Sequence, residues 1–243
     1  DFTNAVLVVV DTHKPSYLAY ADVLNSFEKV VVIDHHRRGP EFIDNALLTY
    51  HEIYASSAAE LVTEILMYLD NVNLTAMEAE SLYAGIVIDT KNFIFKTGVR
   101  TFEVAAYLKR FGIDLTEVKQ LFQNDFETYV AKIDIEKNAE ILRGKIAVSV
   151  CEEDYEDMPI IAAQAADELL SISGILASFV LCKVDKVVMI SGRSMGDINV
   201  QAIMEKIGGG GHLTFAGAQI AGVTLEEAKK RLITSIEEYF GNE

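Results

Sequence analysis

The sequence predicts an α/β protein of two domains, the first built on a doubly wound parallel sheet and the second smaller. Short β-branched apolar runs, such as Ala5–Val10 and Lys29–Ile33, alternate with segments of helical spacing. Such runs are typical of parallel strands that are buried on both faces. After Gly144 the pattern changes to longer strands that alternate with helices. The length of 243 residues also lies between one and two typical domains.

The first half of the chain contains the strands named above and several helices. Ser57 with Glu60, and Thr75 with Glu78, have the three-residue spacing of a capping box at a helix start. Apolar residues then repeat at helical period. The expected elements are helices over Ser16–Phe27, Ser57–Leu69 and Thr75–Ala84, and a third buried strand over Gly85–Ile88.

Residues 100–142 are helical in spacing almost throughout, and no Pro- or Ser-rich linker interrupts them. We therefore expect a first domain over residues 1–125, a helical connector over 126–140 and a second domain over 141–243. The elements expected in the second domain are strands over Ile146–Val150, Ile175–Lys183 and Lys186–Ser191, and helices over Ile160–Ser171, Asn199–Lys206 and Leu225–Tyr239.

The composition excludes several classes of protein. Apolar residues make up 50% and charged residues 24% of the chain, a balance that a disordered chain does not have. No apolar run approaches the roughly 18 residues of a membrane span, and no secretory signal is recognisable. The net charge of −16 opposes binding to long nucleic acids and to anionic membranes. Cys151 and Cys182 fit neither a zinc site nor a disulfide framework, so we expect buried, reduced thiols.

Each of the three expected strands ends in an aspartate. The segments are Asp11-Thr-His13, Asp34-His35-His36 and Asp89-Thr-Lys-Asn92. Parallel strands share one carboxyl edge, so these side chains are expected to converge there, and converging carboxylates call for a cation. Carboxylate and imidazole ligands without thiolate suit Mn²⁺ or Mg²⁺ and also permit Fe²⁺ or Zn²⁺. The alternative for each aspartate is the N-cap of the following helix.

These motifs resemble those of the DHH phosphoesterase superfamily, which is named for its Asp-His-His. The second half is similar to the DHH-associated domain, whose mark is Gly208-Gly-Gly-Gly-His212 followed by Ala216-Gly217. The finer details look most like the GdpP-type cyclic di-AMP phosphodiesterases. They are Ser56-Ser57-Ala58-Ala59-Glu60, Asp89-Thr-Lys-Asn-Phe93, and Ser191-Gly-Arg-Ser194 with Asn199-Val200. The resemblance covers nearly the whole chain.

The resemblance implies a phosphodiesterase with two metal ions, usually manganese. In this reading Asp11 bridges both ions, while His35 and Asp89 complete the shell of the second ion. Asp34 orients His35 from behind, in the arrangement common for metal-bound histidines. His36 faces the phosphate that is cleaved. Two divalent ions neutralise phosphate charge, lower the pKa of a water and hold it in line.

One feature of the superfamily is missing from this chain. None of its five histidines precedes an Asp-x-Asp, so the first motif, His-x-x-x-Asp-x-Asp, is absent. We therefore expect a C-terminal fragment with an incomplete parallel sheet, impaired in activity and able to hold one ion weakly. The resemblance also implies a cytoplasmic location, in a parent protein anchored in the membrane by helices upstream of this chain.

The second half offers candidate substrate contacts. Gly209, Gly210 and Gly211 can bring backbone N–H groups close to a ligand, with His212 as a further donor, although such a run can also simply end a helix. The guanidinium of Arg193 suits a phosphate but can equally form a surface ion pair. Asn199 can contact substrate or cap the next helix.

Several other residues carry weaker signals. A plain structural explanation exists for each of them. His13 and His51 can be structural histidines, Ser56 and Ser57 can cap a helix, and Phe93 and Phe95 can belong to the core.

We therefore expect metal-dependent hydrolysis of cyclic di-AMP to linear pApA. The alternatives are hydrolysis of very short RNA or adenosine bisphosphate by the nanoRNase branch of the superfamily, or a binding or dimerisation module without turnover. Cyclic di-AMP or pApA is then the partner, no long nucleic acid or membrane is contacted by this segment, and the chain forms a homo-oligomer.

Overall fold

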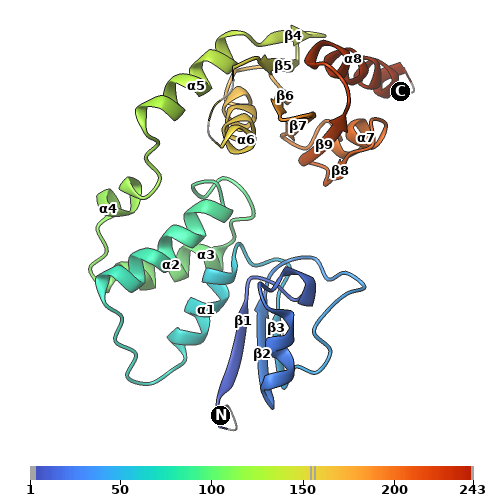
Figure 1. Cartoon of the computed structure of the whole chain (residues 1–243). Coiled ribbons are helices and arrows are strands. Elements are labelled where there is room, and N and C mark those ends of the chain that lie inside the picture. Colours follow the sequence, from blue (N-terminus) through green and yellow to red (C-terminus); the bar gives the residue numbers. More distant parts are fainter. Residues whose placement is uncertain (1–3, 154, 156, 242–243) are drawn as a thin grey trace. The chain divides into compact units, whose positions relative to one another are not determined.

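Residues 4–153, 155 and 157–241 are described by the computed structural model, and the chain divides into two units, Asp1–Gln123 and Asn124–Glu243 (Figure 1). The helix expected as a connector is α5, Phe126–Lys137. It packs within the second unit, because Ala131 and Ile135 are buried in one apolar cluster with the residues of α6, Met158–Leu169. The boundary between the two units therefore lies before this helix.

The first unit is built on a parallel sheet of three strands, β1 (Val6–Val10), β2 (Lys29–Asp34) and β3 (Leu48–His51), in that order. The first two strands lie where the sequence predicts them. The last residue of the third strand, His51, lies beside Asp34 in the register of β2 and β3. All three strands end at one edge of the sheet, which is where the functional side chains gather.

The expected strand over Gly85–Ile88 is wrong, because these residues form the last turns of α2, Ala76–Asp89. The run Ala-Gly-Ile-Val-Ile fits a buried helix as well as a strand, and periodicity alone does not separate the two. Ala79 and Ile86 lie seven residues apart on the buried side of the helix. Gly85 brings the helix close to α1 (Ala58–Met67), since a Cβ at this position would lie 3.0 Å from the Cβ of Ala59.

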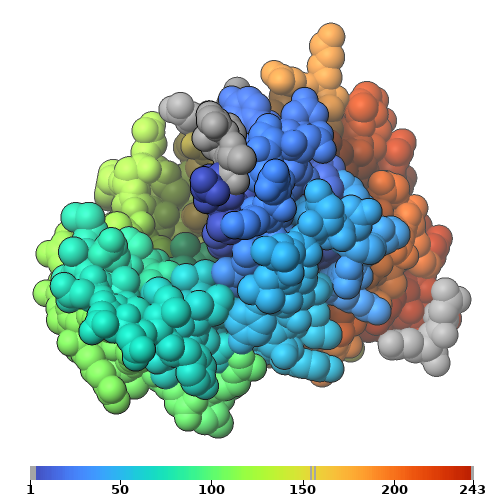
Figure 2. All heavy atoms as spheres, turned by 90° about the horizontal axis from the view of Figure 1, so that it is seen from below, coloured from blue at the N-terminus to red at the C-terminus, as the bar shows by residue number. Residues whose placement is uncertain are grey.

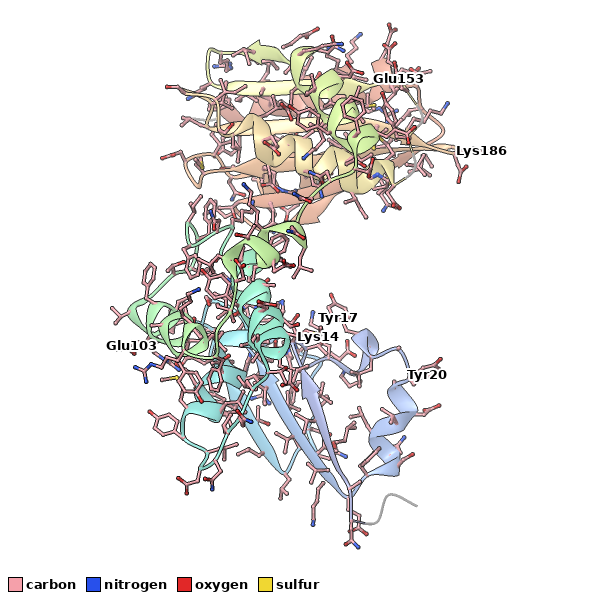
Figure 3. The ribbon with its side chains drawn as sticks, turned by 90° about the vertical axis from the view of Figure 1, so that its left-hand side faces the viewer. Lys14, Tyr17, Tyr20, Glu103, Glu153 and Lys186 are labelled. Carbon is pink, nitrogen blue, oxygen red and sulfur yellow. The ribbon has the colours of Figure 1, made fainter. Side chains whose placement is uncertain are left out.

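The helix expected over Ser16–Phe27 is also wrong. Two short 3₁₀ segments, η1 (Pro15–Tyr17) and η2 (Ala21–Ser26), replace it, and Leu18 between them is extended. Leu18, Leu24 and Phe27 pack against the sheet, while Tyr17 and Tyr20 extend into solvent (Figure 3). Packing on the sheet has overridden the helical periodicity.

Four helices complete the first unit: α1, α2, α3 (Val99–Lys109) and α4 (Leu115–Gln120). Thr75 and Glu78 form the predicted capping box at the start of α2. Ser57 caps α1 by accepting the N–H of Glu60 at 3.0 Å. The carboxylate of Glu60 turns to Ser56 instead, whose hydroxyl donates at 2.5 Å. The motif Ser-Ser-Ala-Ala-Glu is thus a buried cap that fixes the start of α1.

The expectation that β1 is buried on both faces is wrong. Leu7 and Val9 pack inward, but Val6, Val8 and Val10 are each about half exposed. Leu61 of α1 packs on Ile33 of β2, so the helix covers the neighbouring strand and leaves β1 open among the described residues. The first strand (dark blue) reaches the surface in Figure 2.

The second unit is a mixed sheet between two layers of helices. Its strand order is β4-β5-β6-β7-β9-β8, in which β5 and β6 are parallel and the other neighbours antiparallel. One face is covered by α5 and α6, and the other by α7 and α8. The strands are β4 (Glu140–Leu142), β5 (Ile146–Cys151), β6 (Ala177–Val184), β7 (Val187–Ser194), β8 (Gly210–Gly211) and β9 (Phe215–Ala221), and the outer helices are α7 (Val200–Glu205) and α8 (Leu225–Gly241).

The α/β class and the parallel sheet of the first unit agree with the prediction. Cys151 and Cys182 are both free and buried, as expected, and burial raises the pKa of Cys182 to about 11. In the part of the chain that the structure describes, no helix is both long and apolar enough to cross a membrane.

Candidate functional site

The carboxyl edge of the first sheet brings Asp11 and His35 together. Asp11 directly follows β1 with a φ of +65°, and its N–H donates to the carbonyl oxygen of Ile33 at 3.0 Å. The left-handed conformation costs most residues about 1–2 kcal/mol, and aspartate is among the few that adopt it routinely. The backbone turn places a carboxylate oxygen of Asp11 3.4 Å from Nε2 of His35. Such strain is common where a side chain must be held for function.

His35 is oriented as a metal ligand. Its Nδ1 lies 3.4 Å from the carbonyl oxygen of Ala55, which is an acceptor only. The proton therefore belongs on Nδ1, and the lone pair of Nε2 faces the carboxylates of Asp11 and Asp89. A backbone carbonyl behind the ring is the common way in which proteins fix such a histidine. The imidazole is buried, so its orientation does not depend on solvent.

Asp89 reaches the same place from a helix rather than from a strand. It is the last residue of α2, and its Oδ2 lies 3.6 Å from Nε2 of His35. Burial raises the pKa of Asp89, and the negative charge of Asp11 raises this pKa further, against the opposite effect of His35. The two carboxylates therefore repel each other across His35, and a cation would relieve the repulsion.

The distances of Asp11 and Asp89 from His35 can be compared with the spacing of ligands around a divalent metal ion. Two ligands at about 2.1 Å from one ion, with about 110–120° between them, lie roughly 3.4–3.6 Å apart. The separations of both carboxylates from His35 match this spacing. The donor set of oxygen and nitrogen without sulfur suits Mn²⁺, Mg²⁺, Fe²⁺ or Zn²⁺.

Asp34 holds His36 and His13 rather than the ring of His35, which corrects the expectation. One oxygen of Asp34 lies 2.8 Å from Nδ1 of His36, and the other contacts Nδ1 of His13. His35 contributes only its backbone N–H, at 2.9 Å. Burial acts to raise the pKa of Asp34, but hydrogen bonds from His36 and His13 outweigh it and hold the pKa below its ordinary value. Asp34 is thus a fully buried carboxylate that stays ionised.

His13 and His51 have a role that their sequence context did not reveal. The Nε2 of His13 accepts the N–H of Gly39 at 3.3 Å, which leaves the proton on Nδ1, where it is donated to Asp34. His51 lies with its Nε2 4.0 Å from the same Asp34 oxygen and in contact with the carbonyl of His36. His13, Asp34 and His51 also have the spacing of a metal site, but both nitrogens of His13 and the Nε2 of His51 already have hydrogen-bond partners.

His36 is the exposed member of this network. Its Nδ1 is engaged by Asp34 at 2.8 Å and lies 3.9 Å from Asp11. Asp11, His35 and His36 also form a group of potential ligands. Because the Nδ1 of His36 is occupied by Asp34, Asp89 is the better third ligand. The remaining nitrogen, Nε2, is available to a phosphate.

Three of the four glycines at 208–211 have structural reasons. Gly208, with a φ of +82°, follows the end of α7. A Cβ at Gly209 would lie 2.4 Å from the carbonyl oxygen of Gly217, and one at Gly211 would lie 2.5 Å from the backbone of Ala216. Both glycines therefore allow β8 to pair closely with β9. Gly210 has nothing within 4 Å of a Cβ position and faces an open hollow of about 480 Å³.

Arg193 and Asn199 have structural partners of the kind that the sequence analysis gave as alternatives to substrate contact. These are an ion pair for Arg193 and a helix cap for Asn199. Arg193 lies within β7, where its Nε donates to Asp167 at 3.2 Å and its Nη1 to the carbonyl of Gly192 at 3.0 Å. The side-chain oxygen of Asn199 accepts the N–H of Ala202 at 3.2 Å and so caps α7. His212 is exposed and its ring lies 4.6 Å from that of Phe215.

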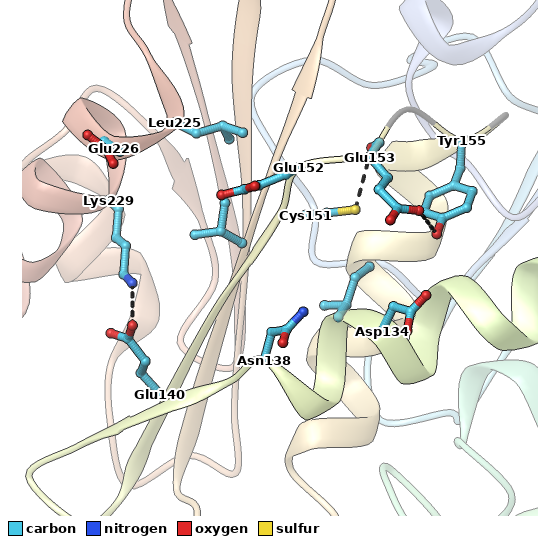
Figure 4. Close-up of a pocket in the computed structure, with 12 residues that line it drawn as sticks. Asp134, Asn138, Glu140, Cys151, Glu152, Glu153, Tyr155, Leu225, Glu226 and Lys229 are labelled. Carbon is cyan, nitrogen blue, oxygen red and sulfur yellow. Dashed lines mark hydrogen bonds and ion pairs between the residues drawn. The ribbon is translucent and has the colours of Figure 1, made fainter.

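A second hollow of the same unit, about 500 Å³, is lined by α5, β5 and the start of α8 (Figure 4). Lys229 pairs there with Glu140 at 2.9 Å. The other charged residues of the described lining are carboxylates, Asp134, Glu152, Glu153 and Glu226. Such a lining repels phosphate, so this hollow does not suit a nucleotide.

The fold and the site together define an α/β protein with a cluster of carboxylate and imidazole side chains at the edge of a parallel sheet. A model of the DHH family, N-terminal domain, matches residues 3–86, and one of the DHHA1 domain matches residues 143–242. The bifunctional oligoribonuclease and PAP phosphatase NrnA of Thermus thermophilus is 30% identical over 97% of this chain and 71% of its own length. This chain therefore belongs to the DHH family.

Two further comparisons extend the likeness. The cyclic-di-AMP phosphodiesterase PdeA of Listeria monocytogenes is 47% identical over 99% of this chain. The chain spans 37% of the length of PdeA. An exopolyphosphatase-related protein from Bacteroides fragilis matches 96% of this chain and 71% of its own with a TM-score of 0.83 at 22% identity, which shows a shared fold.

Proposed function

We propose that this chain is the catalytic region of a phosphodiesterase that hydrolyses cyclic di-AMP to linear pApA with Mn²⁺ as its cation. The observation that carries the proposal is the meeting of Asp11, His35 and Asp89, with both carboxylates within 3.6 Å of one imidazole nitrogen. The 47% identity to PdeA supports the choice of substrate. The carboxylate and imidazole donors suit several divalent ions, and the choice of Mn²⁺ among them follows the resemblance to the DHH superfamily, in which manganese is usual.

In this proposal the residues of the first unit have separate roles in binding the cation and the phosphate. Asp11, His35 and Asp89 would hold the cation, and His36 would meet the phosphate through Nε2. A divalent cation supplies charge neutralisation of the phosphate and a water of lowered pKa. Asp34 fixes the ring of His36 through Nδ1, which leaves Nε2 to meet the phosphate. The water adds to phosphorus and the sugar oxygen leaves, so the cyclic dinucleotide opens to the linear one.

The second unit would recognise the substrate. Gly209 and Gly210 line the open hollow, and Gly211 and His212 follow at the end of this segment. Arg193 has hydrogen bonds through Nε and Nη1, so a phosphate would have to share this guanidinium with Asp167. Asn199 stays a candidate through its amide N–H groups, because its oxygen is used by the cap of α7.

Two other readings have some support. The 30% identity to NrnA, described as an oligoribonuclease and PAP phosphatase, favours short RNA or adenosine bisphosphate as substrates. Cyclic di-AMP is the better proposal because the identity to PdeA is higher, at 47%. The other reading is that this chain alone binds nucleotide or dimerises without turnover, because it lacks the first metal motif. A cytoplasmic location and a homo-oligomeric state also stay predictions.

Calorimetric titration with Mn²⁺ and a hydrolysis assay test the proposal together. We expect this chain to bind Mn²⁺ weakly, and Asp89→Asn or His35→Ala to lower the affinity at least tenfold. The matched control His212→Ala should leave Mn²⁺ binding unchanged. Turnover of cyclic di-AMP, pApA and adenosine bisphosphate should be compared on this chain and on one extended upstream to include the first motif. The proposal fails if Asp89→Asn leaves Mn²⁺ binding intact, or if the extended chain prefers adenosine bisphosphate.

A further inference from the structure

One face of the second sheet is open around β7 and β9. Phe215, Gly217 and Gln219 alternate on this face of β9 and are all exposed. Their register partners on β7 are Arg193, Ser191 and Met189, and residues directly opposite in an antiparallel pair share one face. The hollow of about 480 Å³ lies over the Ser191 and Gly217 row and reaches Gly210.

The fold does not require glycine on the floor of this hollow. A Cβ at Gly210 would have nothing within 4 Å, and one at Gly217 would meet only the carbonyl oxygen of Ile190 at an ordinary 3.4 Å. Neither residue has a left-handed φ. A glycine inside a strand often marks a place where a ligand approaches the backbone. Gly209 and Gly211 differ, because their close contacts with β9 explain them.

An exposed aromatic pair stands at one end of this floor. The rings of His212 and Phe215 lie 4.6 Å apart and are tilted by 58°. The N–H of His212 donates to the carbonyl oxygen of Phe215 at 2.7 Å, so the turn between them is fixed. Phe215 is nevertheless 51% exposed, and Arg193 is its partner in the β7–β9 register. A base can stack on such a ring while a phosphate meets a cation nearby.

We propose that Phe215, supported by His212, is the stacking platform for a purine base whose sugar and phosphate lie over Gly210 and Gly217. The proposal rests on the proposed function, since it assumes an adenine dinucleotide as ligand, and it adds Phe215 as a specificity-determining residue. The open backbone of Gly217 leaves room for the sugar, and the face of Phe215 accepts either adenine of the dinucleotide.

The chain contains no tryptophan, which allows a direct test. Phe215→Trp introduces a single tryptophan, whose fluorescence a stacked purine quenches. We expect pApA to quench it strongly and saturably. Phe126→Trp is the matched control, because Phe126 is a strongly exposed phenylalanine of the same unit, on α5, and its replacement should show no quenching. Binding of pApA without quenching at position 215 would overturn the proposal.

A second set of variants keeps the test independent of tryptophan. Phe215→Ala should weaken the binding of AMP about tenfold or more, within the range that base stacking provides. Phe215→Tyr should restore it. Binding of ribose 5-phosphate, which has no base, should change in neither variant; an equal loss for both ligands contradicts a base contact. Quenching by pApA without hydrolysis of cyclic di-AMP by the extended chain would instead overturn the proposed function alone.

Discussion

Asp34 connects two histidines through a single buried carboxylate. His13 occupies one of its oxygens and His36 the other, while the backbone N–H groups of His35 and His36 also point to it. The rings of His13 and His36 thereby have a proton on Nδ1. The exposed Nε2 of His36 faces outward as a consequence. The second histidine of the Asp-His-His motif is thus fixed by its aspartate, and the first by the carbonyl of Ala55.

Replacement of Asp34 tests this network through stability. Asp34→Asn removes a charged acceptor and leaves His13 buried without its anionic partner, which should lower the free energy of unfolding by about 2–3 kcal/mol at neutral pH. The folded-state pKa of Asp34 is below its ordinary 3.8. Its contribution is therefore fully present above that value and is lost as the pH falls through the lower folded-state pKa.

The measurement is denaturant unfolding of both proteins as a function of pH. The difference between wild type and Asp34→Asn should be constant at neutral pH and shrink only in strong acid. Asp44→Asn, an exposed aspartate of the same unit, is the control and should show no such difference. A gap between wild type and Asp34→Asn that widens toward acid contradicts the network.

At the scale of elements, helix α2 is where the sequence is most ambiguous. Its last turns consist of β-branched and small apolar residues that suit either structure. In the helix, Gly85 packs closely on Ala59, a residue far from it in the sequence. Asp89, at the end of the helix, lies at the edge of the sheet. The prediction that the three aspartates meet there therefore holds, although one of the three predicted strands is a helix.

A substitution at Gly85 distinguishes the helix from a strand by whether it raises or lowers the free energy of unfolding. In a strand, Gly85→Val would supply a favoured β-branched residue and stabilise the protein. In the helix it places a side chain 3.0 Å from the Cβ of Ala59 and should cost about 1–3 kcal/mol of unfolding free energy. Thermal and denaturant unfolding give the sign. Gly98→Ser is the control, because nothing lies within 4 Å of a Cβ there; a stabilised Gly85→Val protein would refute the packing.

The sequence revealed the local features of this fold better than the tertiary ones. Strands β1 and β2, the caps of α1 and α2, and the residues Asp11, His35 and Asp89 follow from apolar runs and short motifs. The replacement of the expected helix over Ser16–Phe27 by two short 3₁₀ segments depends on how Leu18 and Leu24 pack against the sheet. The place of His51 depends on a third strand of four residues, which has little local signal. The partners of Asp34 became visible only with the strand register.

At the scale of the whole molecule, the chain consists of two units with separate cores. The first has clusters around the three-stranded sheet and its helices, and the second has one core on each face of its mixed sheet. The net charge of −16 repels anions at long range, so local features must attract a phosphate. In the proposed function, a cation at Asp11, His35 and Asp89 is such a feature.

The open face of β1 predicts self-association of this chain. Val6, Val8 and Val10 are about half exposed on a strand that has a neighbour, β2, on one side among the described residues. Exposed apolar edge strands pair readily with other chains. Light scattering should therefore report oligomers at high concentration. Val8→Lys should shift the population toward monomer, whereas Leu115→Lys, at an exposed leucine of α4, should not. A clean monomer in the wild type counts against the prediction.

The register that sets Asp34 beside His51 has an evolutionary consequence. His13, Asp34 and His51 lie on three different segments and meet only because β1, β2 and β3 end together. A change at Asp34 leaves the buried ring of His13 without its anionic partner, and a change at His13 removes one hydrogen bond from the buried carboxylate. A change at His51 removes the ring that contacts the carbonyl oxygen of His36, so selection should act against each of these changes. In lineages that keep the Asp-His-His motif, the three positions are therefore expected to be retained together or replaced together, although they are far apart in the sequence.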